Sequence, residues 1–402
     1  MKKIIIAIAC CALVFNGAEA KKKKEVKKEE GFVFTTVKEN PITSIKNQHR
    51  SSTCWSFSGL AFFESELIRM GKGTYDLAEM FLVSKTMQDR AKYCVRLHGD
   101  AGFTPGGSFY DAVFCFRNYG IVPQDAMPTP GTLYSNDTLP NHGELDAVAG
   151  AYVNAIAKGR FKKLSPAWIK GLTAIYDTYL GACPEKFTYN GKEYTPKSFA
   201  KELGLDSLSM DNYVSLTSYT HQPFYSKFSI EIQDNWRQGL SYNLKIDELM
   251  EVIDNAVRNG YTIAWGADVS EDGFTRNGVA IVPDMEKAAE LGSDMAHWLG
   301  LSSTARKDEL NANIPEKEIT QEMRQEGYEN WTTTDDHGML IYGIAKDQNG
   351  KEYYMVKNSW GKSGKYEGVW YVSKAFVKYK TMNILVHKDA VPAAIKNNAG
   401  IK

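Results

Sequence analysis

A cysteine in the first part of the chain stands where a helix is expected to begin. Residues 47–58 read NQHRSSTCWSFS, and apolar residues follow Cys54 at spacings of three and four as far as Met70, the period of an α-helix. A helix N-terminus offers unpaired N–H groups and about half a positive charge, which favour a thiolate over a thiol. The Cys54 N–H and the Gln48 side-chain amide could donate together to an oxyanion. This pattern predicts a nucleophilic cysteine with its own oxyanion hole.

Two distant segments carry groups that could assist this thiol. Residues 334–339 read TDDHGM and place His337 at the start of an apolar strand, and residues 356–361 read VKNSWG. An imidazolium at His337 could pair with a thiolate and then protonate a leaving amine. Asn358 would accept a hydrogen bond from one ring nitrogen and fix the tautomer, and Trp360 could shield that bond from water. The three segments predict hydrolysis of a carbonyl substrate through an acyl-enzyme.

Each of these residues also has a simpler interpretation. A lone cysteine beside a tryptophan is usually a buried apolar residue, so Cys54 is a candidate only together with Gln48, His337 and Asn358. Asp336 would point away from the histidine along the strand, which favours a structural role. A catalytically silent protein that keeps a peptide-binding cleft is the rival hypothesis. The histidines without a comparable context, expected on the surface or in the core, are His49, His98, His142, His221, His297 and His387.

The elements that must position these groups predict an α+β fold. Ser52 or Thr53 can cap the helix that starts at Cys54, and a second helical pattern covers roughly residues 108–119. A helical first half and a stranded last third favour a cleft between two unlike halves. The strands expected after residue 260 cover 261–267, 339–345, 353–357 and 369–372, with a hairpin turn at 347–350.

Composition limits the class of protein. The chain has 402 residues, with 48 Lys and Arg against 48 Asp and Glu, 43% hydrophobic and 24% charged residues. These values exclude collagen-like, coiled-coil and wholly disordered chains. The length predicts two domains or one with a large insertion. Because acidic and basic residues are equal in number, the net charge gives no reason to expect nucleic acid as a partner. No phosphate loop, dinucleotide fingerprint or zinc motif occurs, so we expect no cofactor and no metal.

The first 30 residues predict export. Residues 1–20 combine a charged start, a 12-residue apolar run and the small-x-small end Ala18-Glu19-Ala20, which is typical of a signal peptide. The competing hypothesis is a lipoprotein anchored at Cys10 or Cys11. Residues 21–30 are nearly all Lys and Glu, which favours a disordered spacer, and no segment is long enough to span a membrane. We expect a periplasmic or extracellular protein. Of its remaining cysteines, Cys94, Cys115 and Cys183 leave a disulfide open.

The three motifs resemble those of papain-type cysteine peptidases. Leu77-Ala78-Glu79-Met80 is similar to a further segment of that superfamily, and Gly106-Gly107 lies where the family binds the substrate backbone. The resemblance implies a two-lobed fold, peptide substrates, and a catalytic set of Cys54, His337 and Asn358. It places Gln48 and the Cys54 N–H in the oxyanion hole, and Gly106, Gly107 and Trp360 at the substrate.

The spacing points to one branch of that superfamily. His337 follows Cys54 by 283 residues, against roughly 130–150 in ordinary papain-like enzymes. An insertion of this size is typical of the bleomycin hydrolase and aminopeptidase C branch. The stretches 181–187, 195–199, 211–214 and 265–269 also resemble that branch. The resemblance implies a helical lobe over residues 31–130, a mostly helical insertion over 131–250, and a β-rich lobe over 251–402.

The chain departs from that branch in its last residues. Members use the carboxylate of a C-terminal arm to bind the amino group of the substrate, and that arm contains a Trp-Asp-Pro stretch. Here the chain reads VHKDAVP over 386–392 and ends at Lys402, so we expect a shortened arm and leave open a secreted endopeptidase or broader peptidase. Ser51 replaces the disulfide cysteine of ordinary papain-like enzymes, as the branch predicts. Members form cytoplasmic hexamers, so a homo-oligomer is a further expectation.

Overall fold

A computed structural model describes residues 31–128 and 138–402. The expected signal peptide and spacer lie outside the described residues, and so does the expected domain boundary at 130–131. In the described residues the helices are α1 (Cys54–Arg69), α2 (Glu79–Arg96), α3 (Phe109–Asn118), α4 (Gly143–Ala157), α5 (Ala167–Leu180), α6 (Pro196–Leu203), α7 (Ile246–Arg258), α8 (Met285–Glu290), α9 (Ser293–Leu299), α10 (Ser303–Asp308), α11 (Gln321–Glu329), α12 (Lys374–Lys380) and α13 (Ala393–Ala399). The strands are β1 (Thr35–Glu39), β2 (Phe187–Tyr189), β3 (Lys192–Tyr194), β4 (Tyr213–Thr217), β5 (Lys227–Ser229), β6 (Leu240–Asn243), β7 (Ile263–Ala267), β8 (Val279–Ala280), β9 (His337–Lys346), β10 (Glu352–Lys357), β11 (Val369–Ser373) and β12 (Thr381–His387).

The long strand β9 runs through the middle of the main sheet. The described part of that sheet has ten strands, in the order β5-β6-β4-β12-β7-β9-β10-β11-β8, and β1 pairs with β9 off this path. The β9–β10 hairpin turns at the expected residues 347–350. β7 runs antiparallel to β9, with Ala267 opposite His337. The sheet therefore fixes the start of β9, where the histidine lies, against the end of β7.

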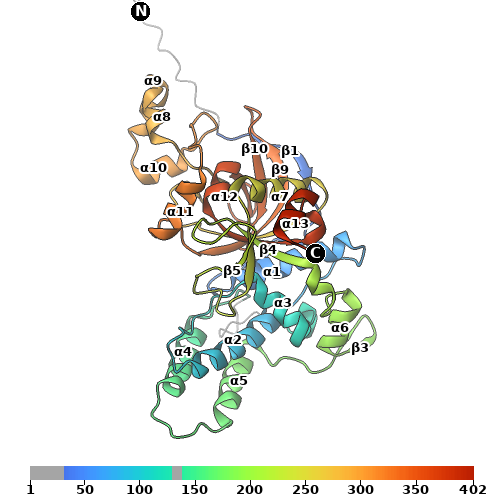
Figure 1. Cartoon of the computed structure of the whole chain (residues 1–402). Coiled ribbons are helices and arrows are strands. Elements are labelled where there is room, and N and C mark those ends of the chain that lie inside the picture. Colours follow the sequence, from blue (N-terminus) through green and yellow to red (C-terminus); the bar gives the residue numbers. More distant parts are fainter. Residues whose placement is uncertain (1–30, 129–137) are drawn as a thin grey trace, which may run out of the picture. The chain divides into compact units, whose positions relative to one another are not determined.

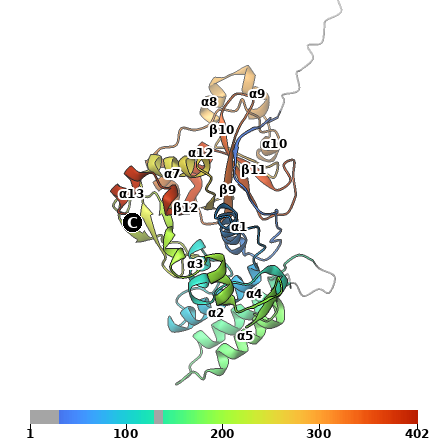
Figure 2. The ribbon, with the colours of Figure 1, turned by 90° about the vertical axis from the view of Figure 1, so that its right-hand side faces the viewer.

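Both faces of the sheet are covered, which explains why β9 is an almost continuous apolar run. Successive side chains of a strand point to opposite faces. Leu340 and Tyr342 pack in one core with α1, α2 and α3. Met339 and Ile341 pack in a second core with α7, α12 and α13. In Figures 1 and 2, α1 accordingly lies between the strands and the group formed by α2, α4 and α5.

The expected insertion contains strands as well as helices. Residues 131–250 were expected to be mostly helical, and α4, α5 and α6 are there, with α4 and α5 packed on α2. However, β4, β5 and β6 from this segment join the main sheet, where β4 pairs with β12. These strands have only three to five residues, too few for a clear alternation of polar and apolar positions. The sheet thus includes strands on both sides of the expected boundary at 250.

The expected β-rich lobe also contains a helical portion. The three short helices α8, α9 and α10 lie together at its edge (Figure 1) and pack around a separate core that includes Met295 and Trp298. After β12, α13 packs its Ile395 and Ala399 into the core that α7 shares with the sheet. Among the described helices, none combines the length and apolar content that a bilayer crossing requires. The four described cysteines are all free.

Candidate active site

Cys54 is the first residue of α1, as the sequence predicts. The expected capping by Ser52 or Thr53 is wrong, because neither side chain caps the helix and the Thr53 hydroxyl instead lies 2.5 Å from the Ser51 hydroxyl. This arrangement leaves the first N–H groups of the helix without a side-chain partner. Ser52 has a φ of 55°, a left-handed conformation that is uncommon for a residue with a side chain. The chain is therefore bent sharply just before the thiol.

Asn358 and Trp360 hold the ring of His337. The Nε2 atom of His337 lies 2.7 Å from Oδ1 of Asn358. The same Oδ1 accepts the backbone N–H of Ser359 at 2.7 Å, which identifies that atom as the oxygen, so Nε2 must carry the proton. The indole of Trp360 lies on the imidazole, with the ring centroids 4.7 Å apart. The other ring nitrogen, Nδ1, is left as the one that can exchange a proton with a thiol.

The protein environment shifts the pKa values of both Cys54 and His337. Burial raises the pKa of Cys54 to about 12, against the opposing effect of the Gly338 and Trp55 N–H groups. Burial lowers the pKa of His337 to about 4, although the bond to Asn358 opposes this. Each group alone is therefore held neutral. A thiolate–imidazolium pair would therefore need the mutual attraction of the two charges and the N–H groups at the helix start.

Gln48 is tied to the loop that carries Asn358. Its backbone N–H donates to the Ser359 carbonyl at 2.8 Å, and its Oε1 accepts the Ser359 hydroxyl at 2.6 Å. Because the carbonyl side of the amide is occupied, the Nε2 side is the one available to donate. Gln48 is buried and lies six residues before the thiol. The Nε2 hydrogens are those that an oxyanion donor would use.

The two glycines at 106–107 lie against bulky neighbours. A Cβ on Gly107 would be 2.8 Å from the ring of Trp55, and a Cβ on Gly106 would be 2.0 Å from the Asp234 carboxylate. Only glycine permits these approaches. The Gly106 carbonyl accepts a hydrogen bond from Arg90 at 2.5 Å. The segment expected to bind a substrate backbone is therefore partly engaged by the protein itself.

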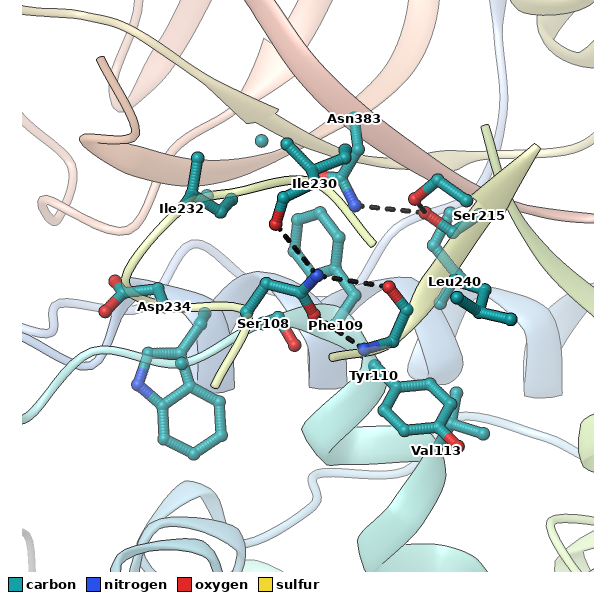
Figure 3. A pocket seen from close by; sticks show the side chains of 18 of the residues that line it. Ser108, Phe109, Tyr110, Val113, Ser215, Ile230, Ile232, Asp234, Leu240 and Asn383 are labelled. Carbon is teal, nitrogen blue, oxygen red and sulfur yellow. Dashed lines mark hydrogen bonds between the residues drawn. The ribbon is translucent and has the colours of Figure 1, made fainter. Parts of the chain in front are cut away.

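A cavity of about 260 Å³ is lined by both Cys54 and His337, whereas Gln48, Gly106, Asn358 and Trp360 do not line it. Cys54, Trp55, Gly107 and His337 line it, with Ser108 and Phe109 from the start of α3. Figure 3 shows Asp234 beside Ser108 at one side of the cavity, with Tyr110, Val113 and Leu240 at the other. The volume is close to the lower limit of small-ligand sites. In the part of the chain that the structure describes, no cluster of three His, Cys, Asp or Glu side chains could hold a metal ion.

Sequence reasoning missed two acidic residues of this cavity. Asp234 lies in the irregular loop between β5 and β6, where the sequence offers no motif. Asp335 lies two residues before His337 in the segment 334–339, so its closeness to the histidine in the sequence could have indicated that it lines the cavity. Asp336 was expected to be structural, and its carboxylate accepts the backbone N–H of Ser270 at 3.0 Å.

Comparison with known proteins identifies the family of this chain. Residues 72–297 and 318–400 match the sequence model of the Peptidase C1-like family. The chain belongs to this family. The matched part of this Peptidase C1-like chain includes His337 and Asn358, and Cys54 precedes it. Aminopeptidase C of Lactobacillus helveticus is 22% identical over 446 residues, covering 95% of this chain and 90% of the relative. Aminopeptidase W of Lactobacillus delbrueckii subsp. lactis is 24% identical, covering 88% and 82%.

The fold of this Peptidase C1-like chain is similar to a solved structure. The crystal structure of PepW from Lactobacillus rhamnosis HN001 superposes with a TM-score of 0.66 and 19% identity, covering 91% of this chain and 84% of that one. The papain-like α+β fold and the aminopeptidase C branch, both expected from the sequence, are thus confirmed. The chain is a cysteine-type peptidase most like an aminopeptidase C.

Proposed function

We propose that this peptidase removes residues from the amino terminus of peptides, with Cys54 as nucleophile, His337 as acid and base, and Asn358 as the residue that orients the imidazole. The observation that carries the proposal is the 2.7 Å contact between His337 and Asn358 in a cavity that also exposes Cys54 at the start of a helix. The relatives named aminopeptidases, which align over most of their length, support the choice of substrate.

The geometry supports a two-step reaction. The Cys54 thiolate attacks the peptide carbonyl, and the carbonyl oxygen gains negative charge, which the Cys54 N–H and the Gln48 amide stabilise. Protonated His337 gives its proton to the leaving amine. His337 then takes a proton from water, which attacks the thioester and releases the acyl product. Throughout, Asn358 accepts from Nε2 and keeps Nδ1 available for these transfers.

Substitution of the thiol tests this mechanism. Cys54→Ala should abolish peptide hydrolysis while leaving the folded state intact, as judged by circular dichroism. Cys54→Ser should be nearly as poor, because a hydroxyl does not ionise at neutral pH. A thiol-directed epoxide inhibitor should label the unmodified protein at Cys54. Undiminished hydrolysis by Cys54→Ala would rule the mechanism out, and a folded protein that the epoxide does not label would indicate a silent peptide-binding protein.

A matched pair of peptides tests where the substrate is cut. One fluorogenic peptide is prepared with a free α-amine and again with an acetylated amine. An aminopeptidase cuts only the free-amine version, whereas a secreted endopeptidase or broader peptidase cuts both at similar rates. Mapping the cleavage sites on longer peptides then shows how many residues leave at each step.

Export and assembly are further parts of the proposal. The charged start, apolar run and Ala18-Glu19-Ala20 end of residues 1–20 support export to the periplasm or beyond. Cell fractionation with amino-terminal sequencing would find a mature chain beginning at Lys21, whereas a lipid-modified cysteine would show a lipoprotein. Light scattering would establish whether the protein forms the hexamer expected from the branch, and a gel-shift titration would test the expectation that it does not bind nucleic acid.

A further inference from the structure

Two carboxylates that the mechanism does not use face the thiol. Asp234 comes from the loop between β5 and β6, and Asp335 comes from the segment just before β9, yet both line the cavity that contains Cys54. Both oppose ionisation of the Cys54 thiol through their negative charge, which places them within electrostatic reach of the sulfur. Two segments a hundred residues apart thus deliver acidic groups to one side of the nucleophile.

Arg90 fixes the position of Asp234. The Arg90 side chain is 1% exposed, and its Nη1 lies 3.5 Å from Oδ1 of Asp234. The same Nη1 donates to the Gly106 carbonyl at 2.5 Å, and Nη2 donates to the Gln233 carbonyl at 3.2 Å. A buried arginine therefore joins the 233–234 loop to Gly106. Because this carboxylate is held before any ligand arrives, little ordering is lost on binding.

Asp234 also occupies the path of a longer substrate. Burial raises the pKa of Asp234, whereas Arg90 and then the Gly107 N–H favour its charged form, and the Gly106 carbonyl is taken by Arg90. An extended peptide that ran along Gly106 and Gly107 would need these backbone groups for its own hydrogen bonds. The chain of a bound peptide must therefore stop beside Asp234. What it presents at that point is its amino terminus.

The carboxylates of Asp234 and Asp335 are not fully balanced by nearby cations. Within the described residues, Asp335 has no hydrogen-bond or ion-pair partner, and Arg90 is the one cation in contact with Asp234. Burial, then Asp234, then Asp336 raise the pKa of Asp335 to about 7, as expected for like charges held together. A primary ammonium group placed between the two carboxylates would relieve this repulsion and form charge-assisted hydrogen bonds.

The C-terminal residues 388–402 lie away from the cavity that contains Cys54. Residues 388–402 pack through Val391, Ile395 and Ile401 into the core around α7, and the Ala390 carbonyl accepts a hydrogen bond from Asn255 of that helix. None of these residues lines the cavity that contains Cys54. The carboxylates that face the thiol are side chains from the interior of the chain.

We propose that Asp234 and Asp335 together bind the free α-ammonium group of the peptide substrate and so direct cleavage to its amino terminus. This inference rests on the proposed peptidase function and adds the residues that select the substrate. Arg90 acts as a positioning residue, because it holds Asp234 and does not itself contact the ammonium group.

The test compares free-amine and acetylated versions of one fluorogenic peptide on Asp234→Asn, Asp335→Asn and the double variant. Each single variant should lower kcat/KM for the free-amine peptide about tenfold to hundredfold, the effect of losing a charged hydrogen bond, mostly through KM. The rate on the acetylated peptide should stay the same or rise, so the ratio between the peptides approaches one in the double variant. Asp272→Asn, which alters an exposed carboxylate paired with Lys307, is the matched control and should change neither rate.

Two further measurements keep the outcomes separate. If the double variant is labelled by the epoxide at Cys54 but keeps the full preference for the free amine, the ammonium site is wrong and the peptidase function stands. If the unsubstituted protein is neither labelled nor active, both the peptidase function and the ammonium site are wrong. Calorimetry on folded Cys54→Ala protein needs no turnover: leucinamide should bind and acetyl-leucinamide should not, and equal binding of the two would also overturn the ammonium site.

Discussion

The hydroxyl of Ser359 donates to Oε1 of Gln48 across 2.6 Å, joining two residues that lie 311 positions apart in the chain. The Gln48 backbone N–H donates back to the Ser359 carbonyl at 2.8 Å. Ser359 also donates its own N–H to Asn358. One serine therefore links the residue that orients the imidazole to the amide that faces the oxyanion. We expect small changes at this residue to affect chemistry more than binding.

Ser359→Ala should lower kcat about two- to tenfold with little change in KM, since one neutral hydrogen bond that orients Gln48 is lost. Gln48→Ala removes the donor itself and should cost about 100-fold or more. Steady-state kinetics on one peptide provide both values. Because Ser359 acts through Gln48, adding Ser359→Ala to Gln48→Ala should cause almost no further loss. Additive losses in the double variant would contradict this link.

Asn358→Ala should lower kcat by up to about 100-fold, because the imidazole loses the acceptor that keeps the proton on Nε2. The bond from Asn358 also raises the pKa of His337, so its loss should disfavour the imidazolium further. Asn358→Asp supplies an acceptor at the same place and should retain more activity than Asn358→Ala. Kinetics and circular dichroism of the two variants check this ordering, and equal losses would show that the side chain serves folding only.

Cys54, His337 and Asn358 could be predicted because each lies at or next to the end of a regular element. A helix beginning at Cys54 and a strand beginning at His337 follow from apolar spacing, and the structure has both. The pairing of β9 with β10 follows from the hairpin turn at 347–350. The pairing of β9 with β7 could not be predicted, since it depends on contacts distant in sequence. Asp234 lies in a loop without periodicity, and its role depends on Arg90 more than a hundred residues earlier. Short strands such as β5 were missed for the same lack of pattern.

The binding of free-amine substrates should strengthen as the pH rises through about 7. Asp335 has its pKa raised to about 7 by burial, then by Asp234 and Asp336, so it is mostly protonated at pH 6 and mostly charged at pH 8. An ammonium group binds the charged form, and therefore KM for the free-amine peptide should fall from pH 6 to about pH 7.5. It should rise again above about pH 8, where the α-amino group of the peptide loses its own proton. Of the other facing groups, Tyr219 stays protonated because burial raises its pKa. Burial lowers the pKa of His337 to about 4, so outside its pair with the Cys54 thiolate it does not change charge over this range.

The acetylated peptide is the control for this pH dependence. It has no ammonium group, so its KM should not follow the ionisation of Asp335. Asp335→Asn should remove the fall in KM for the free-amine peptide. A slope that persists in Asp335→Asn would assign the pH dependence to another group.

The protein should lose stability as the pH falls from about 6.5 to about 4, in part through His142. This residue is 1% exposed, and burial lowers its pKa to about 4. The unfolded chain therefore takes up a proton at a higher pH than the folded chain, and its protonation favours unfolding below pH 6.5. The difference in pKa corresponds to about 3 kcal/mol at pH 4. His142→Leu should flatten the pH dependence of the free energy of unfolding, measured in urea between pH 4.5 and pH 7.

This loss of stability should reach the active site first. The His142 backbone N–H donates to the Arg50 carbonyl at 3.0 Å, and Arg50 lies four residues before the thiol. Labelling of Cys54 by the epoxide should therefore weaken at a higher pH than the global unfolding midpoint. His297, whose side chain is 75% exposed, provides the matched control, since His297→Leu removes a histidine that folding does not bury. A similar flattening in His297→Leu would show that the acid sensitivity does not come from a buried neutral histidine.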